Sequence, residues 1–236
     1  MQYGVFSDVH GNLGALEAIW PALDTACLTD RPVFNAGDVV GYGDSPEACV
    51  RFLRAHPTIV TVRGNYDKSV AAFPKREAEY RKKWGKLRPE KYAAIQRDSK
   101  AITDETRQWL AALPGEVEMA LDGVAVLMTH YAPGSKEGLG SKEGLGSWTP
   151  DARLAELAET TDAKIVVCGH THTPFVRAVG GVLWVNPGSL GRSYDGCFRY
   201  AVLTLLPGQP PTAQLKQLGR RPCALPPLTS GPIPPR

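Results

Sequence analysis

Short polar clusters, each placed after a predicted strand, constrain this chain more than any other feature. Residues 2–6, 32–35 and 59–62 are apolar runs typical of strands, and helical patterns lie between them. Strand–loop–helix units in succession predict an α/β sheet, which binds ligands in the loops at the carboxyl ends of its strands. The clusters occupy these loops and the ends of two later strands: Asp8-Val9-His10, Gly37-Asp38, Gly64-Asn65-Tyr66-Asp67, Thr129-His130 and Gly169-His170-Thr171-His172.

Capping signals predict where the first two helices begin. Asn12 is the expected N-cap of a helix whose apolar side includes Leu16 and Leu23. Ser45 is the expected N-cap of the second helix, with Pro46 at the first helical position and an acidic residue next to it.

The second half of the chain is richer in strands. Asp122-Gly123 and Gly180-Gly181 each separate two strand-like runs and are two-residue hairpin signals. Such a chain can form two stacked sheets with helices outside them. We expect strands at residues 117–121, 124–129, 164–168, 175–179, 182–185 and 198–206, the last being the final strand, and a helix at 150–159.

Residues 75–113 interrupt this rhythm and are predicted to form a helical insertion, with helices at 75–84 and 89–113. Residues 75–100 hold ten Lys and Arg but only four Asp and Glu, interleaved with aromatic residues. One interpretation is a solvated helical hairpin whose aromatic side chains pack on the body of the protein. The other is a cap that places cations and stacking faces over the site for a polyphosphate or nucleotide.

The chain is expected to form one main domain at residues 1–206, including this cap-like insertion, followed by a Pro-rich C-terminal tail at 207–236. A six-residue sequence at 135–140 repeats at once at 141–146. This repeat lengthens a loop just after His130, and we interpret it as a tolerated surface insertion.

Composition excludes several classes of protein. A formal net charge of +3 does not suggest general nucleic-acid affinity, and no apolar run approaches the roughly 18 residues that a membrane helix needs. Five scattered cysteines without a Cys-x-x-Cys pair fit a reducing compartment, and the first residues lack a basic-then-apolar export signal. We therefore expect a cytoplasmic protein with no membrane partner.

The histidines indicate a metal site. Four of the five lie in the polar clusters, and only His56, expected to end a helix at the surface, lies outside them. Imidazole is the commonest nitrogen ligand of metals, and carboxylate and amide oxygens are its hard partners. His170 and His172 are the strongest signal, because two imidazoles two residues apart after a strand are uncommon without a metal.

Taken in order, the clusters resemble the signature of the calcineurin-like metallophosphoesterase family over most of residues 1–206. The resemblance implies a mixed α/β fold (α+β), built as a four-layer α/β/β/α sandwich of two mixed sheets. The later Asn186-Pro187-Gly188-Ser189 is similar to bacterial and archaeal members, including those related to diadenosine tetraphosphatases and phosphodiesterases. The matching motifs are Asp8-x-His10, Gly37-Asp38, Gly64-Asn65, His130 and Gly169-His170-x-His172.

The resemblance also implies two divalent metal ions. Asp38 would bridge them, and two ions about 3.5–4 Å apart can bind the attacking hydroxide and clamp phosphoryl oxygens. Manganese is the expected metal, with iron, zinc, nickel and magnesium as alternatives. Asp8, His10, Asp38 and His172 would hold the first ion, and Asp38, Asn65, His130 and His170 the second.

Position 66 departs from the family pattern Gly-Asn-His-Glu/Asp. Tyr66 replaces a histidine that assists the leaving group, and tyrosine, with a reference pKa of about 10, is a weaker acid at pH 7. Asp67 is retained. Poor leaving groups need a proton as they depart, so the chain is expected to act on phosphoanhydrides or activated phosphodiesters. The Asp-Arg-Gly run of protein Ser/Thr phosphatases is also absent after Asp38.

The expected activity is hydrolysis of such a bond by metal-bound hydroxide, in a small phosphorylated substrate such as a nucleotide or dinucleoside polyphosphate. Arg63, Asn65 and Arg192 are candidates for holding phosphate oxygens, with structural salt bridges as the alternative for both arginines. General phosphodiesterase or protein phosphatase activity and a non-catalytic metal-binding interaction module remain alternatives, and homo-oligomers are left open. The candidate catalytic residues are Asp38, Asn65, Tyr66 and Asp67.

Overall fold

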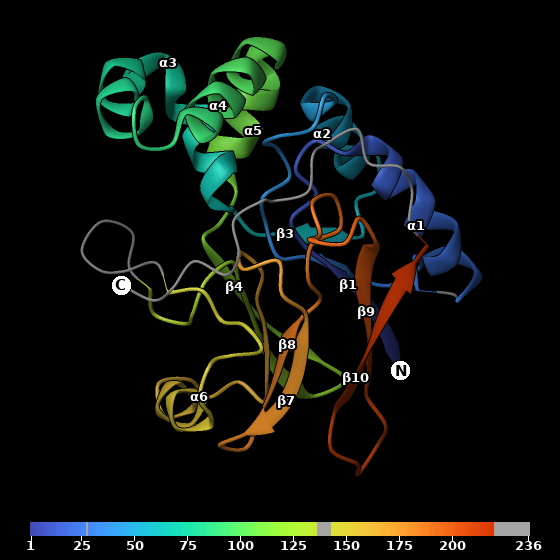
Figure 1. The fold of residues 1–236 in the computed structure, drawn as a ribbon. Coiled ribbons are helices and arrows are strands. Elements are labelled where there is room, and N and C mark those ends of the chain that lie inside the picture. Colours follow the sequence, from blue (N-terminus) through green and yellow to red (C-terminus); the bar gives the residue numbers. More distant parts are fainter. Residues whose placement is uncertain (27, 136–142, 220–236) are drawn as a thin grey trace.

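The computed structural model describes residues 1–26, 28–135 and 143–219, and they form a four-layer sandwich (Figure 1). Two five-stranded sheets face each other, and helices cover their outer faces. The predicted mixed α/β sandwich of two sheets is therefore confirmed. No helix within these described ranges is long and apolar enough to cross a membrane.

The first sheet has the strand order β10-β9-β1-β2-β3. β1, β2 and β3 are parallel, while β9 and β10 run antiparallel to their neighbours. The loops after the three parallel strands therefore leave the sheet at one edge. The strands are β1 (Gln2–Phe6), β2 (Val33–Asn35), β3 (Ile59–Thr61), β9 (Phe198–Thr204) and β10 (Thr212–Leu218).

The second sheet has the strand order β4-β5-β6-β8-β7, in which β5, β6 and β8 are parallel. Its two hairpins turn as predicted, because Asp122, Gly123, Gly180 and Gly181 all have the positive φ of a type I′ turn. The strands are β4 (Glu116–Leu121), β5 (Val124–Thr129), β6 (Ile165–Val167), β7 (Phe175–Val179) and β8 (Val182–Asn186).

The central strands are buried on both faces. In β6, Ile165 and Val167 point into the core between the sheets, while Val166 packs on the outer side with α6. A strand covered on both faces reads as a continuous apolar run, because neither set of alternating side chains meets water. This burial fixes the register of the strands from which the polar loops emerge.

Six helices complete the layers. Asn12 caps α1 as predicted, because its side chain accepts a hydrogen bond from the Ala15 backbone N–H at 3.1 Å. Ser45 lies at the expected N-cap position of α2, but its side chain makes no capping hydrogen bond. The helices are α1 (Leu13–Thr25), α2 (Pro46–Ala55), α3 (Asn65–Trp84), α4 (Pro89–Ala101), α5 (Asp104–Ala112) and α6 (Asp151–Ala158).

The helices of the insertion differ from their predicted bounds. The helix expected at 75–84 begins ten residues earlier, at Asn65, and continues through Pro74. The helix expected at 89–113 is two helices, because Thr103 starts a new one by accepting the Thr106 backbone N–H at 3.2 Å. Figure 1 shows α3, α4 and α5 gathered beyond one edge of the sheets. The first helix of the insertion therefore begins within the polar cluster, at Asn65.

The strand expected at 198–206 is not the last one, so that prediction is wrong. Part of the predicted Pro-rich tail forms β10, which pairs with β9 along its whole length. β10 is an exposed edge strand rich in polar side chains, as edge strands often are, so its sequence lacks the apolar alternation that predicts a strand. Residues 220–236 of the tail and 136–142 of the repeat lie outside the described residues.

Trp184 and Trp148 offer a matched test of the outer core. Trp184 is fully buried against α6, and its indole N–H donates to the Val179 carbonyl at 3.2 Å. We expect Trp184→Ala to lower the free energy of unfolding by about 3–5 kcal/mol, because it leaves a large cavity. Trp148, which is 52% exposed, should change it by no more than about 0.5 kcal/mol when replaced by alanine.

Urea denaturation followed by circular dichroism measures both changes. Equal losses in the two variants would contradict the placement of Trp184 in the core.

Candidate metal centre

The polar loops of both sheets meet at the edge where the parallel strands end. β1, β2 and β3 lead into the clusters at residues 8, 38 and 65, and β5 and β6 lead into those at 130 and 170. The side chains of the predicted metal ligands are polar, yet they are withdrawn from solvent. Those classed as buried are Asp8, His10, Asp38, Asn65, His130 and His172, and His170 is half-buried.

One group of ligand atoms gathers around Asp8. The Nε2 atoms of His10 and His172 are 2.9 Å apart, and Asp8 Oδ1 lies 3.7 and 3.2 Å from them respectively. Two nitrogens that each bind one ion at about 2.1 Å stand about 3 Å from each other. These three side chains therefore have the spacing of ligands around a single cation.

A second group adjoins the first through Asp38. Its Oδ2 lies 3.4 Å from His130 Nε2 and 3.9 Å from His10 Nε2, so this oxygen stands between the two groups. Asp8, Asp38 and His130 form the second set of closely spaced ligand atoms. The ring of His170 lies 5.2 Å from that of His130, centroid to centroid.

Backbone carbonyls set the protonation of three imidazoles. The Nδ1 atoms of His10, His130 and His172 lie 3.3, 2.7 and 2.9 Å from the carbonyl oxygens of Val40, Ala36 and Arg192 respectively. A carbonyl oxygen can only accept, so each Nδ1 carries the proton. The lone pair of each neutral ring is then on Nε2, which faces the centre, as metal-binding histidines require.

Each carboxylate has one anchored oxygen and one that faces the centre. Asp8 Oδ2 accepts from the Ser7 hydroxyl at 2.7 Å and from the His170 backbone N–H at 3.0 Å. Asp38 Oδ1 accepts from the Tyr66 backbone N–H at 2.7 Å, which leaves Oδ2 toward the imidazoles.

Several buried atoms at the centre lack a hydrogen-bond partner among the described residues. They include Asp8 Oδ1, Asn65 Oδ1 and His130 Nε2. An unsatisfied buried polar atom costs about 1–3 kcal/mol, and native proteins rarely leave three in one place. All three can donate an electron pair, so the residues fit a cation and not an anion.

The charges of the centre also call for a cation. Burial alone would raise the pKa of Asp8, but His172, His130 and His10 outweigh it and hold this pKa below its ordinary value. Burial lowers the pKa of His10 to about 4, and the neighbouring His172 adds to this effect. Burial opposes protonation of His130 as well, yet Asp38 and Asp8 raise its pKa to about 9, so without a metal ion a second proton sits on Nε2, and a bound cation would take the place of that proton. Positive charge is therefore favoured between the two carboxylates.

Five of the seven predicted metal ligands have left-handed backbone conformations. Asp8, His10 and Asp38 have φ of 55°, 52° and 53°, and His170 and His172 have 70° and 60°. Such a conformation costs a residue other than glycine roughly 1 kcal/mol or more and is concentrated at functional sites. The surrounding structure holds these residues in strained conformations.

Two motif glycines allow the backbone to approach the carboxylates. A Cβ atom on Gly64 would overlap Asp38 Oδ1, and one on Gly169 would overlap the Ser7 hydroxyl that anchors Asp8. Any larger residue at either position would push a carboxylate out of place.

Asp67 braces the start of α3. Its Oδ2 accepts from the Gly64 backbone N–H at 2.9 Å, and its Oδ1 accepts from the Val40 backbone N–H at 3.2 Å. Burial, followed by the nearby Asp38, raises the pKa of Asp67 to about 7. Through these contacts the oxygens of Asp67 fix the loops that carry Asp38 and Asn65.

Tyr66 lies beside the centre with its hydroxyl already engaged. That hydroxyl donates to the hydroxyl of Tyr42, and the Tyr66 ring meets His10 edge-on, at 5.2 Å between centroids. Burial, followed by the Tyr42 hydroxyl, raises the pKa of Tyr66 above its ordinary value. Tyr66 therefore keeps its proton at neutral pH.

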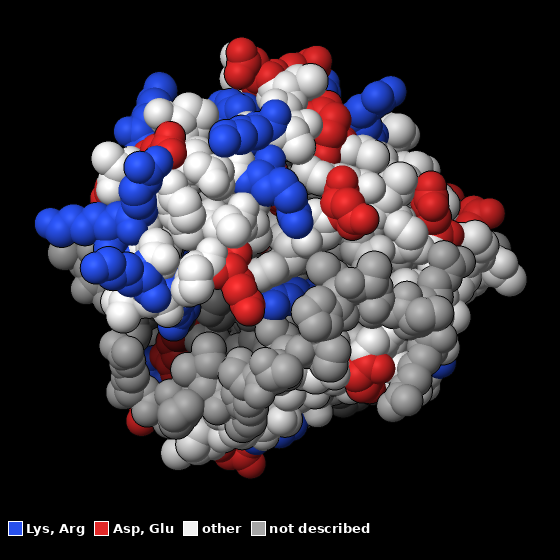
Figure 2. All heavy atoms as spheres, turned by 45° about the horizontal axis from the view of Figure 1, so that its top comes forward, with Lys and Arg blue, Asp and Glu red and all other residues white. Residues whose placement is uncertain are grey.

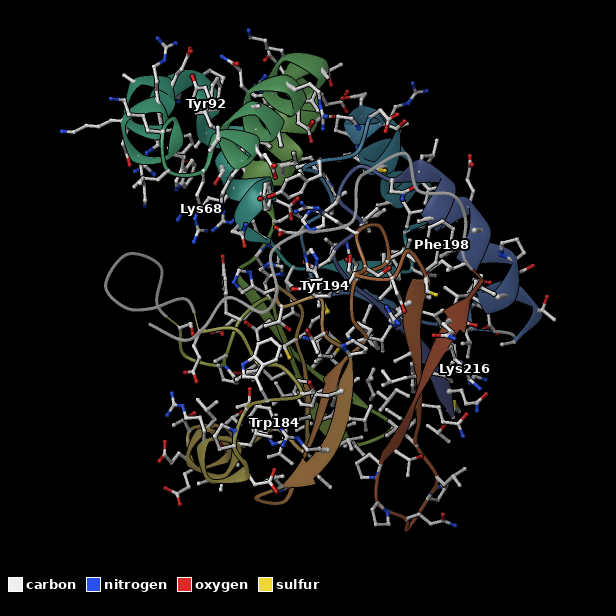
Figure 3. All side chains as sticks on the ribbon, in the orientation of Figure 1. Lys68, Tyr92, Trp184, Tyr194, Phe198 and Lys216 are labelled. Atoms are coloured by element: carbon white, nitrogen blue, oxygen red, sulfur yellow. The ribbon has the colours of Figure 1, made fainter. Side chains whose placement is uncertain are left out.

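The two candidate phosphate-binding arginines have different surroundings. Arg63 donates from Nη1 to the Ala111 carbonyl of α5 at 2.8 Å, which favours a structural role. The guanidinium of Arg192 lies 3.3 Å from the centroid of the Tyr42 ring. The backbone carbonyl of Arg192 accepts the hydrogen bond from His172 Nδ1. Tyr194, labelled in Figure 3, extends from the loop of Arg192, with its ring 6.4 Å from that of His172.

The Asn186–Ser189 motif supports the centre in a way that the sequence did not reveal. The Asn186 amide donates to the carbonyls of Gly169 and Leu145 at 2.9 and 3.1 Å, and the Ser189 hydroxyl donates to the Asp8 carbonyl at 2.9 Å. Leu145, within the repeat interpreted as a surface insertion, is fully buried. The end of that repeat is therefore anchored beside the loop of His170, and this part of the surface interpretation is wrong.

Asp98 is a further residue that sequence reasoning missed. It is fully buried on α4, and its Oδ2 accepts from the Gly41 backbone N–H at 2.6 Å. Arg97 donates from Nη2 both to Asp98 Oδ1 and to the Gly43 carbonyl, at 2.8 and 2.5 Å. An acid on the same side of a helix as Ala94 and Ile95 was the available signal. These contacts tie the insertion to the loop after Asp38.

Comparisons with known proteins agree with this geometry. Residues 1–206 match the family model of the calcineurin-like phosphoesterase superfamily domain. The uncharacterized protein MJ0912 of Methanocaldococcus jannaschii is 30% identical over 210 residues, which cover 81% of this chain and 77% of that protein.

Two solved structures are similar in fold. The metallophosphoesterase from Sphaerobacter thermophilus has 25% sequence identity and a TM-score of 0.67, and the alignment covers 94% of this chain and 89% of that one. The protein PH1004 of Pyrococcus horikoshii OT3 has a TM-score of 0.78 with the same two coverages. Its sequence identity is 14%, so this likeness concerns the fold alone.

Metal binding should stabilise the fold, because it satisfies the orphaned buried atoms. At a free Mn²⁺ concentration about 100 times Kd, we expect a gain of about 2.7 kcal/mol. For a chain of this size the gain corresponds to a rise in Tm of about 5–10 °C in a thermal scan.

His172→Ala should remove most of that shift, whereas His56→Ala should keep it, because the His56 ring donates to the Phe52 carbonyl at the end of α2 and packs on Trp20 and Phe52. An unchanged Mn²⁺ shift in His172→Ala would exclude His172 as a ligand.

Proposed function

Because this chain belongs to the calcineurin-like phosphoesterase superfamily, whose members are metal-dependent hydrolases of phosphoric esters, we propose that it hydrolyses phosphoanhydrides or activated phosphodiesters with two divalent ions, manganese first among the candidates. The observation that carries this proposal is the set of buried, inward-facing atoms without hydrogen-bond partners. When bound, such ions supply an activated water at neutral pH and positive charge for phosphoryl oxygens. Asp8, His10 and His172 would hold one ion, and Asn65, His130 and His170 the other, with Asp38 between them.

The residues around the carboxylates would hold the metal ligands in place. The backbone N–H of Tyr66 and the hydroxyl of Ser7 hold Asp38 and Asp8 so that neither carboxylate can turn away. Asp67 keeps the N-terminus of α3, and with it Asn65, against the loop that carries Asp38. Preorganised groups of this kind need no rearrangement during the reaction.

Tyr66 limits the leaving groups that the centre can expel. Its hydroxyl already donates to Tyr42, and its pKa is raised, so it is a poor proton donor. An alkoxide leaving group needs a proton, whereas a nucleotide phosphate or an aryl oxide leaves without one. This supports phosphoanhydrides and activated diesters over nucleic acid.

Positive charge near the centre supports a small phosphorylated substrate, such as a nucleotide or dinucleoside polyphosphate. Arg192 lies over Tyr42, whose ring lies 5.4 Å from that of His10, and a guanidinium pairs well with phosphate oxygens. Figure 2 shows Lys and Arg side chains gathered on the side of the molecule where Figure 1 places α3 and α4. The hydrogen bond of Arg63 to α5 leaves Arg192 as the better candidate of the two arginines.

A substrate panel tests the proposal directly. With Mn²⁺, we expect the protein to hydrolyse a dinucleoside polyphosphate and an aryl phosphodiester faster than an alkyl monoester or a phosphopeptide. Changes to residues around metal ligands typically cost 10–100-fold, so His130→Ala, which removes a ligand, should lower kcat/KM at least about 100-fold. His56→Ala is the control and should stay within about twofold of the original chain. Absence of hydrolysis of every compound, with Mn²⁺ bound, would refute the proposal.

A series of aryl diesters with phenols of graded acidity tests the role of Tyr66. We expect kcat to rise steeply as the leaving phenol becomes more acidic, because no group supplies a proton. Tyr66→Phe should change kcat less than about threefold for the most acidic phenol. Tyr66→His should speed the poorest leaving groups selectively, since general-acid catalysis contributes up to roughly 10²–10⁴-fold. A rate indifferent to phenol acidity in the unmodified chain would show that a proton donor is present.

A further inference from the structure

Two cations from distant parts of the chain lie on neighbouring aromatic rings beside the metal centre. The ammonium of Lys91, on α4, is 4.8 Å from the centroid of the Tyr66 ring, and the guanidinium of Arg192 is 3.3 Å from that of Tyr42. The two rings are 4.9 Å apart, and their hydroxyl groups hydrogen-bond to each other. The four side chains therefore form one continuous array.

The array touches a predicted metal ligand. The rings of Tyr66 and Tyr42 lie 5.2 and 5.4 Å from the ring of His10, centroid to centroid. Each cation is thus separated from His10 by one aromatic ring.

Lys91 is held in place by two aromatic faces. Its ammonium lies 4.8 Å from the ring of Trp84 as well as from that of Tyr66, and the residue is half-buried. A cation over an aromatic face gains about 0.5–1 kcal/mol at exposed sites and more when it is desolvated. The positive charge of Lys91 therefore has a defined position beside the centre.

The insertion that carries Lys91 is fixed to the loop that carries Tyr42. Asp98 of α4 accepts from the Gly41 backbone N–H, and Arg97 donates to the Gly43 carbonyl. The helix α4 therefore hydrogen-bonds to the backbone of both residues that flank Tyr42. The aromatic residues of the insertion pack together behind this contact, as in the pair of Tyr80 and Trp84, whose rings are 4.6 Å apart. Tyr80 belongs to the core cluster that also includes residues of α1 and α2, Trp84 and Tyr92 pack against this cluster, and Lys91 lies beside the site.

Several other cations of the insertion are paired with acids. Arg76 bonds to Glu79 at 2.6 Å, and Arg81 bonds to Glu77 at 2.7 Å, both on the exposed side of α3. Pairing cancels much of their charge toward an incoming anion. The basic composition of residues 75–100 therefore overstates the charge that these two arginines offer to an anion.

We propose that Lys91 and Arg192 form an anion subsite for a second phosphate group of the substrate, bonded to the phosphate that is attacked at the metal centre. The inference deepens the proposed function and rests on it, because the metal centre positions the first phosphate. Arginine offers a planar fork of donors and lysine a compact charge, and both are common phosphate partners. The chain thus selects phosphoanhydrides, such as nucleoside diphosphates and longer, over compounds with a single phosphate.

Calorimetric titration with two related ligands tests the subsite without any hydrolysis. The ligands are AMP and adenosine 5′-(α,β-methylene)diphosphate, which differ by one phosphate group and a bridge that resists cleavage. We expect the Mn²⁺-loaded protein to bind the second ligand at least about tenfold more tightly, a difference of about 1.4 kcal/mol. Lys91→Gln, which keeps the aliphatic stem, should remove most of this preference and leave the Kd for AMP within twofold.

Matched variants separate a lost charge from a disturbed fold. Lys91→Arg should retain the preference, and Lys100→Gln, at an exposed position on the same helix, should not alter it. Arg192→Gln should reduce the preference as Lys91→Gln does. Tm and bound Mn²⁺ are measured for each variant, and Lys91→Met replaces any Lys91→Gln protein that is unstable.

The outcomes are distinguishable from those of the hydrolysis tests. Equal affinity of the original chain for both ligands, or equal weakening of both by Lys91→Gln with Mn²⁺ retained, would overturn the subsite and leave hydrolysis of diesters untouched. A chain that prefers the diphosphate analogue but hydrolyses nothing would overturn the proposed function and leave the subsite in place.

Discussion

Two carboxylates, Asp8 and Asp38, are buried side by side, and the loops around them are arranged to keep them there. Desolvation and mutual repulsion both oppose this arrangement. It holds because hydroxyl and backbone donors anchor one oxygen of each carboxylate, while the other oxygen faces imidazoles and the place of a cation. The strained backbone of the loops and the glycines at 64 and 169 serve the same arrangement, since each brings donors within reach of a carboxylate.

Local signals were sufficient to predict most of the fold. The Asn12 cap, the two hairpin turns and the doubly buried strands depend on residues close in sequence, so their patterns survive without knowledge of the tertiary structure. The meeting of the polar clusters was also predictable, because parallel strands deliver their carboxyl ends to one edge of each sheet, whereas the assignment of each ligand came from the family resemblance. The structure brings these side chains together.

Tertiary contacts account for what the sequence did not reveal. β10 is a strand because β9 supplies its hydrogen bonds, and its own composition is that of a polar loop. In the sequence, Asp98 is one more charged residue of a basic helix. Its role depends on the Gly41 backbone N–H, which only the tertiary structure brings to it. α3 begins at Asn65 because Asp67 caps it from within the polar cluster, a role visible only when Gly64 and Val40 are seen to donate to it.

The insertion is therefore part of the site and not an addition to it. Its first helix begins at Asn65, a predicted metal ligand. Its second helix brings Asp98 to the loop that follows Asp38 and brings Lys91 to the ring of Tyr66. The candidate metal centre depends on backbone geometry that tolerates little change, whereas Lys91 lies on aromatic faces outside it. On the proposed subsite, changes in α4 would alter which group beyond the first phosphate is accepted, while the candidate metal ligands stay where they are.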